Sequence, residues 1–172
     1  RMDLFNAIKN ELGELPIIAE DLGTMTQGVI DLREATGFPG MKILGFAFDS
    51  KEENDYLPHT YTKNCVVYTG THDNDTLIGW FTKANEDDKQ FARDYLNSRS
   101  DDEIHWDAIR AAWSSVASMA IVPIQDFLGL GSEARINTPG LASGNWQWRL
   151  KEGVLTDELA ERIAKLTKVY SR

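Results

Sequence analysis

The chain has 172 residues, of which 42% are hydrophobic and 26% charged, a composition typical of one globular domain with a sizeable core. Its formal net charge of −9 argues against nucleic acid or an anionic membrane as partner, and no apolar run reaches the roughly 20 residues of a membrane span. The single cysteine, Cys65, excludes an internal disulfide and favours a cytoplasmic location; we expect it to be a small core residue.

Short apolar runs alternate with helical patterns along the chain. The apolar runs predict four strands, over residues 16–19, 41–46, 65–69 and 120–124. The helical patterns predict helices over residues 4–12, 26–35, 75–82, 87–96, 104–116 and 157–170. Gly13 and Gly37 end the first two helices, and the stretch 132–149 is rich in Asn, Gly and Trp and is expected to be irregular.

The helix predicted to start near residue 104 carries most of the sequence signals for the core. Ser100 and Glu103 form a capping box, in which the hydroxyl accepts an amide hydrogen and the carboxylate reaches back to the cap. Trp106 and Trp113 lie seven residues apart, which indicates one buried face. His105 is expected on the helix surface.

Strands separated by helices imply a parallel sheet, because a parallel crossover needs a connection the size of a helix. A full (β/α)₈ barrel takes roughly 250 residues. Four strands fall short of it, so the residues alone leave open a small α/β sheet or half of a barrel.

Polar clusters follow three of the four predicted strands. Glu20 and Asp21 follow the first, residues 71–75 (THDND) the third, and Gln125 and Asp126 the fourth. Active sites of α/β proteins lie at the carboxyl ends of parallel strands. The sequence therefore predicts one pocket lined by carboxylates.

Carboxylates with a histidine suit acid/base chemistry, and a glycosidase places two carboxyl groups about the scissile bond. Spacing alone would pair Glu20 with Asp73. The alternatives are that Glu20 caps a turn and that the acidic run around Asp73 starts a helix. The run lacks the ligand spacing of a calcium loop and the three histidines are scattered, so we expect neither a metal nor another cofactor.

Several segments, in one order along the chain, resemble the amylomaltase (4-α-glucanotransferase) family. They are residues 17–23 (IIAEDLG), 37–44 (GFPGMKIL), 56–59 (YLPH), 68–76 (YTGTHDNDT), 126–135 (DFLGLGSEAR) and 144–149 (GNWQWR).

This resemblance implies an α/β fold in which residues 1–172 form the C-terminal half of a single catalytic (β/α)₈ barrel, strands five to eight with their helices. It implies transfer of α-1,4-glucan segments between maltodextrins by a retaining double displacement. Glu20 would be the general acid/base, and Asp73 and His72 would hold hydroxyls of the reacting sugar. Asn145 would reach the same sugar, and Tyr56 and His59 would lie on the acceptor side. The resemblance thus implies six site residues: Glu20, Asp73, His72, Asn145, Tyr56 and His59.

The resemblance also contradicts the pairing of Glu20 with Asp73 as the two catalytic carboxyl groups, which spacing alone suggests. The family nucleophile is an aspartate on the fourth barrel strand within an Arg-x-Asp-His motif, which this chain does not contain. We therefore expect the nucleophile upstream of Arg1, and expect the chain alone to be inactive. Unpaired sheet edges should make it self-associate or pair with the missing half. Two other functions stay open: a starch hydrolase of the α-amylase superfamily, and a noncatalytic carbohydrate-binding half-domain.

Overall fold

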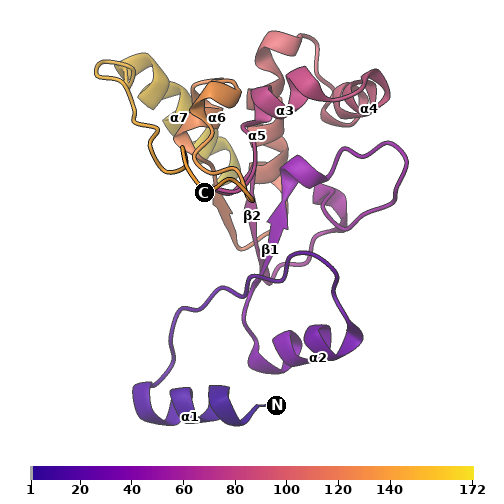
Figure 1. Cartoon of the computed structure of the whole chain (residues 1–172), viewed down its shortest axis with the longest axis vertical. Coiled ribbons are helices and arrows are strands. Elements are labelled where there is room, and N and C mark those ends of the chain that lie inside the picture. The colour runs from indigo at the N-terminus through magenta and orange to yellow at the C-terminus, as the bar shows by residue number, and fades with distance from the viewer. Residues whose placement is uncertain (1) are drawn as a thin grey trace.

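A parallel sheet forms the centre of the computed structural model, which describes residues 2–172 (Figure 1). Within these residues the sheet has three strands in the order β1-β2-β3: β1 is Gly40–Ile43, β2 is Cys65–Tyr68 and β3 is Met119–Ile121. Both pairings are parallel, as the alternation of apolar runs and helices predicts.

Helices connect and follow the strands. The α-helices are α1 (Asp3–Leu12), α2 (Gln27–Thr36), α3 (Leu77–Lys83), α4 (Glu86–Leu96), α5 (Ile104–Ser114), α6 (Ile124–Phe127) and α7 (Asp157–Tyr170). The 3₁₀ turns are Leu44–Phe46, Pro58–Thr60, Asp101–Glu103 and Ser132–Ala134. Side chains that accept an amide hydrogen from the first turn explain where α3, α4 and α7 begin: Thr76, Asn85 and Thr156.

The strand predicted over residues 16–19 does not form. This run is joined to the sheet region by one backbone hydrogen bond, from Ala19 N to Pro39 O at 2.9 Å, just before β1 begins. Pro16 has no N–H to donate to a ladder. The run is apolar enough for a strand, but a strand also needs a continuous row of partners.

The other strands are shorter than the apolar runs. The first ends at Ile43, after which the chain turns into the 3₁₀ turn Leu44–Phe46. The last ends at Ile121, and Pro123 then precedes α6. Apolar character continues past each strand because these turns also pack into the core, where Leu44 is fully buried.

The two faces of the sheet have different surroundings. Cys65 and Val67 of β2 point to the helices and are at most 1% exposed, which confirms the prediction for Cys65. Successive strand residues point to opposite faces. Tyr68 and its register partner Ile121 therefore share the other face, where Ile121 is 39% exposed. One face is thus the main core, and the other borders a cavity.

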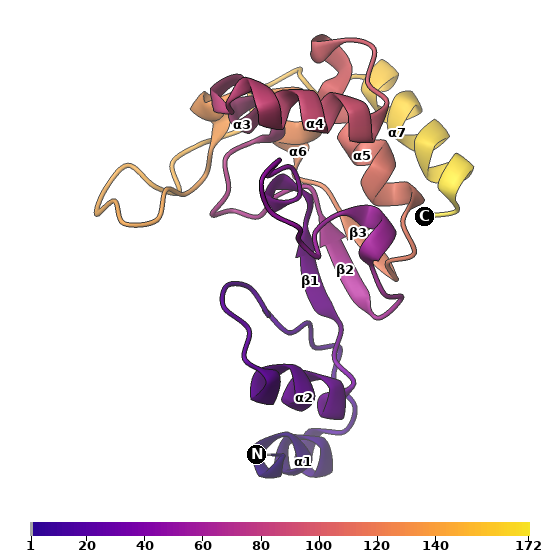
Figure 2. The ribbon, with the colours of Figure 1, turned by 90° about the vertical axis from the view of Figure 1, so that its right-hand side faces the viewer.

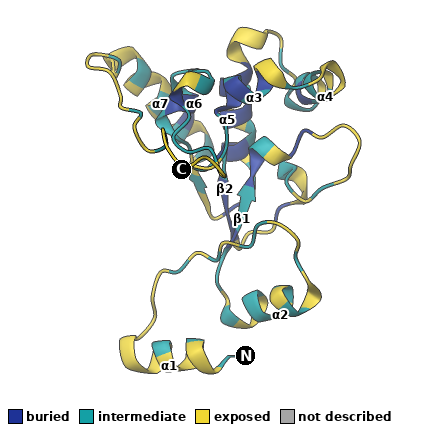
Figure 3. Cartoon of the chain, viewed as in Figure 1, coloured by how far each residue is buried: buried dark blue, intermediate teal, exposed yellow. Residues whose placement is uncertain are grey.

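Helix α5 supplies much of that core (Figure 3). Trp106 and Trp113 are buried as predicted. His105 is buried too, so its predicted surface position is wrong; its ring packs against Gly129, and its Nδ1 has no hydrogen-bond partner within residues 2–172. Burial lowers the pKa of this imidazole. The segment after β3 covers a second side of α5, which the helical periodicity could not reveal.

The predicted capping box forms in part. The Ser100 hydroxyl accepts the amide hydrogen of Asp102 at 3.3 Å, at the start of a 3₁₀ turn. Glu103 does not reach back to the cap; it pairs with Arg162 of α7, whose guanidinium lies 3.9 Å from the centre of the Trp106 ring. A partner 59 residues away replaces the local contact.

Helices α1 and α2 lie apart from the other helices, beyond the amino-terminal end of β1 (Figure 2). Neither has a buried residue, and Leu4 and Leu12 of α1 are more than 60% exposed. Within residues 2–172 no helix has the length and apolarity to cross a membrane.

Candidate active site

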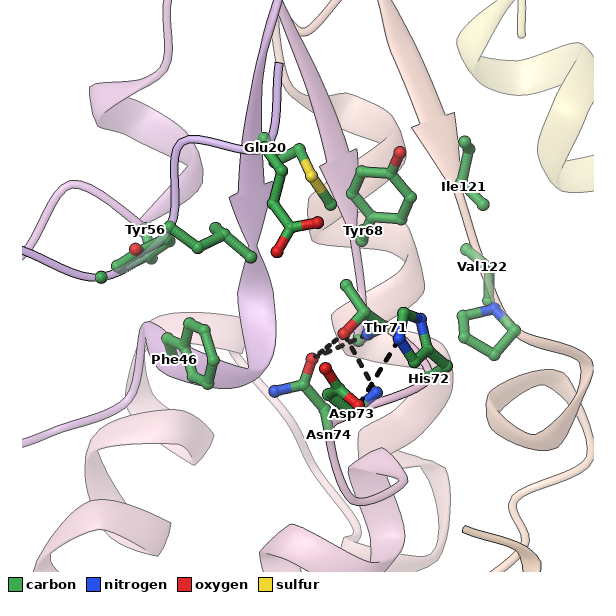
Figure 4. Close-up of a pocket in the computed structure, with 15 residues that line it drawn as sticks. Glu20, Phe46, Tyr56, Tyr68, Thr71, His72, Asp73, Asn74, Ile121 and Val122 are labelled. Carbon is green, nitrogen blue, oxygen red and sulfur yellow. Dashed lines mark hydrogen bonds and ion pairs between the residues drawn. The ribbon is translucent and has the colours of Figure 1, made fainter. Parts of the chain in front are cut away.

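A cavity of about 870 Å³ lies at the carboxyl ends of the three strands (Figure 4). The residues that line it come from the segment before β1, from all three strands and from the segments that follow them: Glu20, Leu22, Gly23, Met41, Phe46, Tyr56, Tyr68, Gly70, Thr71, His72, Asp73, Asn74, Ile121, Val122 and Pro123. Four of the six residues predicted from the sequence thus face one cavity: Glu20, Tyr56, His72 and Asp73.

The segment that carries Glu20 is fixed by its neighbour Asp21. One oxygen of Asp21 accepts the Met41 amide hydrogen at 2.7 Å, and the other accepts Arg33 Nη1 of α2 at 2.8 Å. Gly40 leaves room for this carboxylate, because a Cβ at that position would lie 2.2 Å from Asp21 Oδ2. Glu20 itself is exposed and projects into the cavity (Figure 4).

Replacing Asp21 should release this segment. We expect Asp21→Ala to lower the free energy of unfolding by about 1 kcal/mol, because the Met41 amide and Arg33 lose a partly buried acceptor. The amide hydrogen of Ala19 should exchange faster in the variant, as measured by hydrogen exchange. Asp31→Ala on the exposed side of α2 is the matched control, and equal exchange at Ala19 in both variants would contradict the anchoring role.

The turn after β2 presents His72 and Asp73. Asn74 Oδ1 accepts both the backbone N–H and the hydroxyl of Thr71, each at 2.8 Å, which closes the turn. His72 Nε2 lies 3.5 Å from Asp73 Oδ1, and about half of each side chain is exposed. Both side chains are therefore free to contact a ligand in the cavity.

Aromatic rings form the walls. Phe46 and Tyr56 pack edge to face with centroids 5.4 Å apart, and the Tyr61 hydroxyl donates to Tyr56 O at 2.6 Å. Burial raises the pKa of the Tyr56 and Tyr68 hydroxyls, and Asp21 and Asp55 add to the effect at Tyr56. Both hydroxyls are thus neutral donors near neutral pH.

Asp75 and Asp126 do not line the cavity, and their hydrogen bonds stabilise the structure around it. Asp75 Oδ2 accepts Lys83 Nζ and the Ser132 hydroxyl, each at 2.7 Å. Burial raises the pKa of Asp75, but these two hydrogen bonds and the Thr76 amide outweigh it and lower the pKa. Among residues 2–172 no group of three or more His, Cys, Asp or Glu side chains is placed to hold a metal ion.

The structure does not bring His59 and Asn145 to this cavity. His59 lines a separate depression beside α4 and α5, and its Nδ1 lies 3.0 Å from the Tyr95 hydroxyl. The Asn145 side chain is occupied by its own loop: Oδ1 accepts the Thr138 amide hydrogen at 2.9 Å, and Nδ2 donates to Thr138 O and Leu141 O. The substrate contacts that the motifs predict for these two residues stay predictions.

Asn145 does help to place its neighbour Trp146 beside the site. The Trp146 ring lies 5.0 Å from the His72 ring, is 57% exposed and has a positive φ of 63°. Non-glycine residues seldom adopt this backbone conformation. Nearby, Arg135 and Asn137 hydrogen-bond to the turn carrying Asp73, and no sequence pattern predicts a role for either residue.

Two carboxylates and a histidine line an aromatic-walled cavity at the carboxyl ends of parallel strands, where α/β proteins place their active sites, and these side chains suit acid/base chemistry. The family model for 4-alpha-glucanotransferase matches residues 1–156. The chain therefore belongs to the 4-alpha-glucanotransferase family.

Individual relatives agree with this assignment. The chain is 51% identical to the 4-alpha-glucanotransferase of Clostridium butyricum, covering 99% of this chain and 35% of the relative. It is 46% identical to the one from Thermus thermophilus, covering 98% and 35%. The solved amylomaltase of Streptococcus agalactiae in complex with acarbose is 38% identical, with a TM-score of 0.93 over 98% of this chain and 34% of that one. The chain spans about a third of the length of these proteins.

Proposed function

We propose that the protein containing this chain transfers α-1,4-glucan segments between maltodextrins by a retaining double displacement. The observation that carries the proposal is that Glu20 and Asp73, on separate segments, face one cavity in a chain of the 4-alpha-glucanotransferase family. The related Streptococcus agalactiae amylomaltase was solved in complex with acarbose, which supports a glucan as the ligand here. The buried thiol of Cys65 supports a cytoplasmic location as part of the same proposal.

Each side chain has a proposed role. Glu20 protonates the departing glycosidic oxygen and then deprotonates the incoming 4-hydroxyl. Asp73 and His72 hold hydroxyls of the reacting sugar, and the Asp73 contact strengthens as the ring flattens in the transition state. Tyr56 forms the wall on which a sugar can pack. The substrate contacts proposed for His59 and Asn145 rest on the motifs alone, because neither residue lines this cavity.

The chain supplies the acid/base but not the nucleophile. We propose that residues 1–172 form the C-terminal part of one (β/α)₈ domain, and that the nucleophilic aspartate belongs to the remaining part. Two observations support this: the sheet face carrying Ile121 is partly exposed, and the segment 16–19 runs beside β1 without a full ladder. The remaining part would cover both.

A chimera tests the proposal. In it, this chain replaces the matching segment of the Clostridium butyricum relative, and glucan products from maltotriose are separated by length. We expect glucose together with glucans longer than maltotriose, since transfer must lengthen one product for each glucose released. The 172-residue chain alone should give neither. Glucose and maltose without longer glucans would identify a hydrolase, and maltotriose left intact by a folded chimera would refute catalysis.

A further inference from the structure

The Asp73 carboxylate is half exposed on a short turn, and its own turn does little to orient it. Within that turn the Asp73 amide donates to the Thr71 hydroxyl at 3.3 Å, which fixes the backbone and leaves the carboxylate to rotate. A transition-state contact is effective only when the group is already held in position. The orienting contacts must therefore come from another segment.

Asn137 provides two of these contacts from 64 residues further along the chain. Its side-chain Nδ2 donates to Asp73 Oδ1, and its backbone N–H donates to His72 O at 3.1 Å. One residue thus holds both the carboxylate and the backbone next to it. The second oxygen, Oδ2, keeps its acceptor positions for a ligand.

Arg135 joins the same two segments through backbone oxygens. Its Nη2 donates to Asp73 O at 2.7 Å and its Nε donates to Asn137 O at 2.8 Å. The guanidinium therefore ties the two segments together without binding the Asp73 carboxylate. A direct ion pair would neutralise that carboxylate, whereas the amide of Asn137 orients it and leaves its charge in place.

The segment of residues 135–137 is itself anchored on both sides. Gln125, which is 4% exposed, donates from Nε2 to Ala134 O at 3.2 Å, and the Trp146 amide donates to Ile136 O at 2.8 Å. A contact from an anchored segment restricts the turn that it touches. A contact from a free loop would not.

We propose that Arg135 and Asn137 are positioning residues, which hold the Asp73 carboxylate oriented toward the sugar; this rests on the function proposed above for Asp73. They need not touch the substrate. Their loss should lower kcat more than it raises KM, because the oriented charge matters most in the transition state.

The test uses Asn137→Ala and Asn137→Asp in the chimera. We expect Asn137→Ala to lower kcat about 100-fold with KM changed less than about threefold. Asn137→Asp removes the donor and places a second carboxylate beside Asp73, so it should be at least as slow near neutral pH. Its kcat should recover as the pH falls, because protonation restores a donor. A merely structural role would not shift the pH profile in this way.

Two further variants separate local positioning from general loosening of the loop. Arg149 also binds backbone oxygens in this region, those of Trp146 and Trp148, but does not contact the Asp73 turn. Arg149→Lys should therefore keep kcat within about twofold, while Arg135→Lys, which loses the forked donor, should lower it at least about tenfold. Equal kcat in Arg135→Lys and Arg149→Lys, or an Asn137→Asp pH profile parallel to the parent, would overturn the proposal.

A measurement without catalysis separates this inference from the proposed function. In the 172-residue chain, hydrogen exchange of the Asp73 and Asn74 amides should be faster in Asn137→Ala than in the parent and in Arg149→Lys. Faster exchange with an inactive parent chimera would refute the transferase and support the positioning contacts. Unchanged exchange would refute the contacts whatever the parent catalyses.

Discussion

Glu20→Gln should lower kcat for maltotriose disproportionation by the chimera about 1,000-fold or more, because glutamine cannot give a proton to the departing oxygen or take one from the acceptor. The substitution keeps the size of the side chain. Glu20 is exposed, so the fold and the affinity for maltooligosaccharide should change little. Initial rates and isothermal titration with acarbose measure the two quantities.

The proton-donor role has a specific signature. A glucosyl fluoride donor needs no protonation of its leaving group, so the first turnover of fluoride release by Glu20→Gln should approach the parent rate far more closely than the first turnover of maltotriose cleavage does. Glu52→Gln, in the exposed loop after β1, is the matched control and should keep full activity. Equal loss of the first-turnover rate with both donors would show that Glu20 is not the acid.

The sequence predicted best what depends on local order along the chain. The strand predicted over residues 65–69 forms as β2 and begins at Cys65, and the helix predicted over residues 87–96 forms as α4 after the cap Asn85, because a buried apolar run and a cap are both local signals. The strand predicted over residues 16–19 does not form, because apolar residues alone do not supply a neighbouring strand to pair with. The predicted contact of Glu103 with its own cap does not form either, because Glu103 pairs with Arg162, which is close only after the chain has folded.

The same distinction holds in the site. His72 and Asp73 could be located because they follow the apolar run that forms β2, and the ends of parallel strands meet. Glu20 follows the run 16–19, which forms no strand but is held next to the start of β1 by the Ala19–Pro39 hydrogen bond. His59 and Asn145 were chosen by motif alone, and their side chains are bound to Tyr95 and to Thr138. Asn137 carried no signal, since its contact with the Asp73 turn spans 64 residues of an irregular region.

Asp126 links the core to this site and should show the largest effect on stability. Its Oδ2 accepts the Thr69 hydroxyl at 2.5 Å, at the end of β2, and its Oδ1 accepts the Leu77 amide hydrogen at 2.8 Å, at the start of α3. These two contacts bracket the turn that carries His72 and Asp73. Asp126→Leu would leave both buried donors unpaired and should lower the free energy of unfolding by about 3 kcal/mol in urea titration.

The pH dependence distinguishes loss of the hydrogen bonds from loss of the charge. Burial raises the pKa of Asp126 above its usual 3.8, although the hydrogen bonds from Thr69 and Leu77 oppose the shift. The Asp126 carboxyl therefore contributes its full stability below pH 3.8, and this contribution falls as the pH rises through the pKa of the folded state. Asp126→Asn keeps an acceptor for Leu77 and has no charge to bury. Relative to the parent it should gain stability as the pH rises above the unfolded value of 3.8, whereas the exposed control Asp102→Asn should show no such gain. A parent and Asp126→Asn that differ by the same free energy at every pH would show that the carboxyl titrates alike in the folded and unfolded chains.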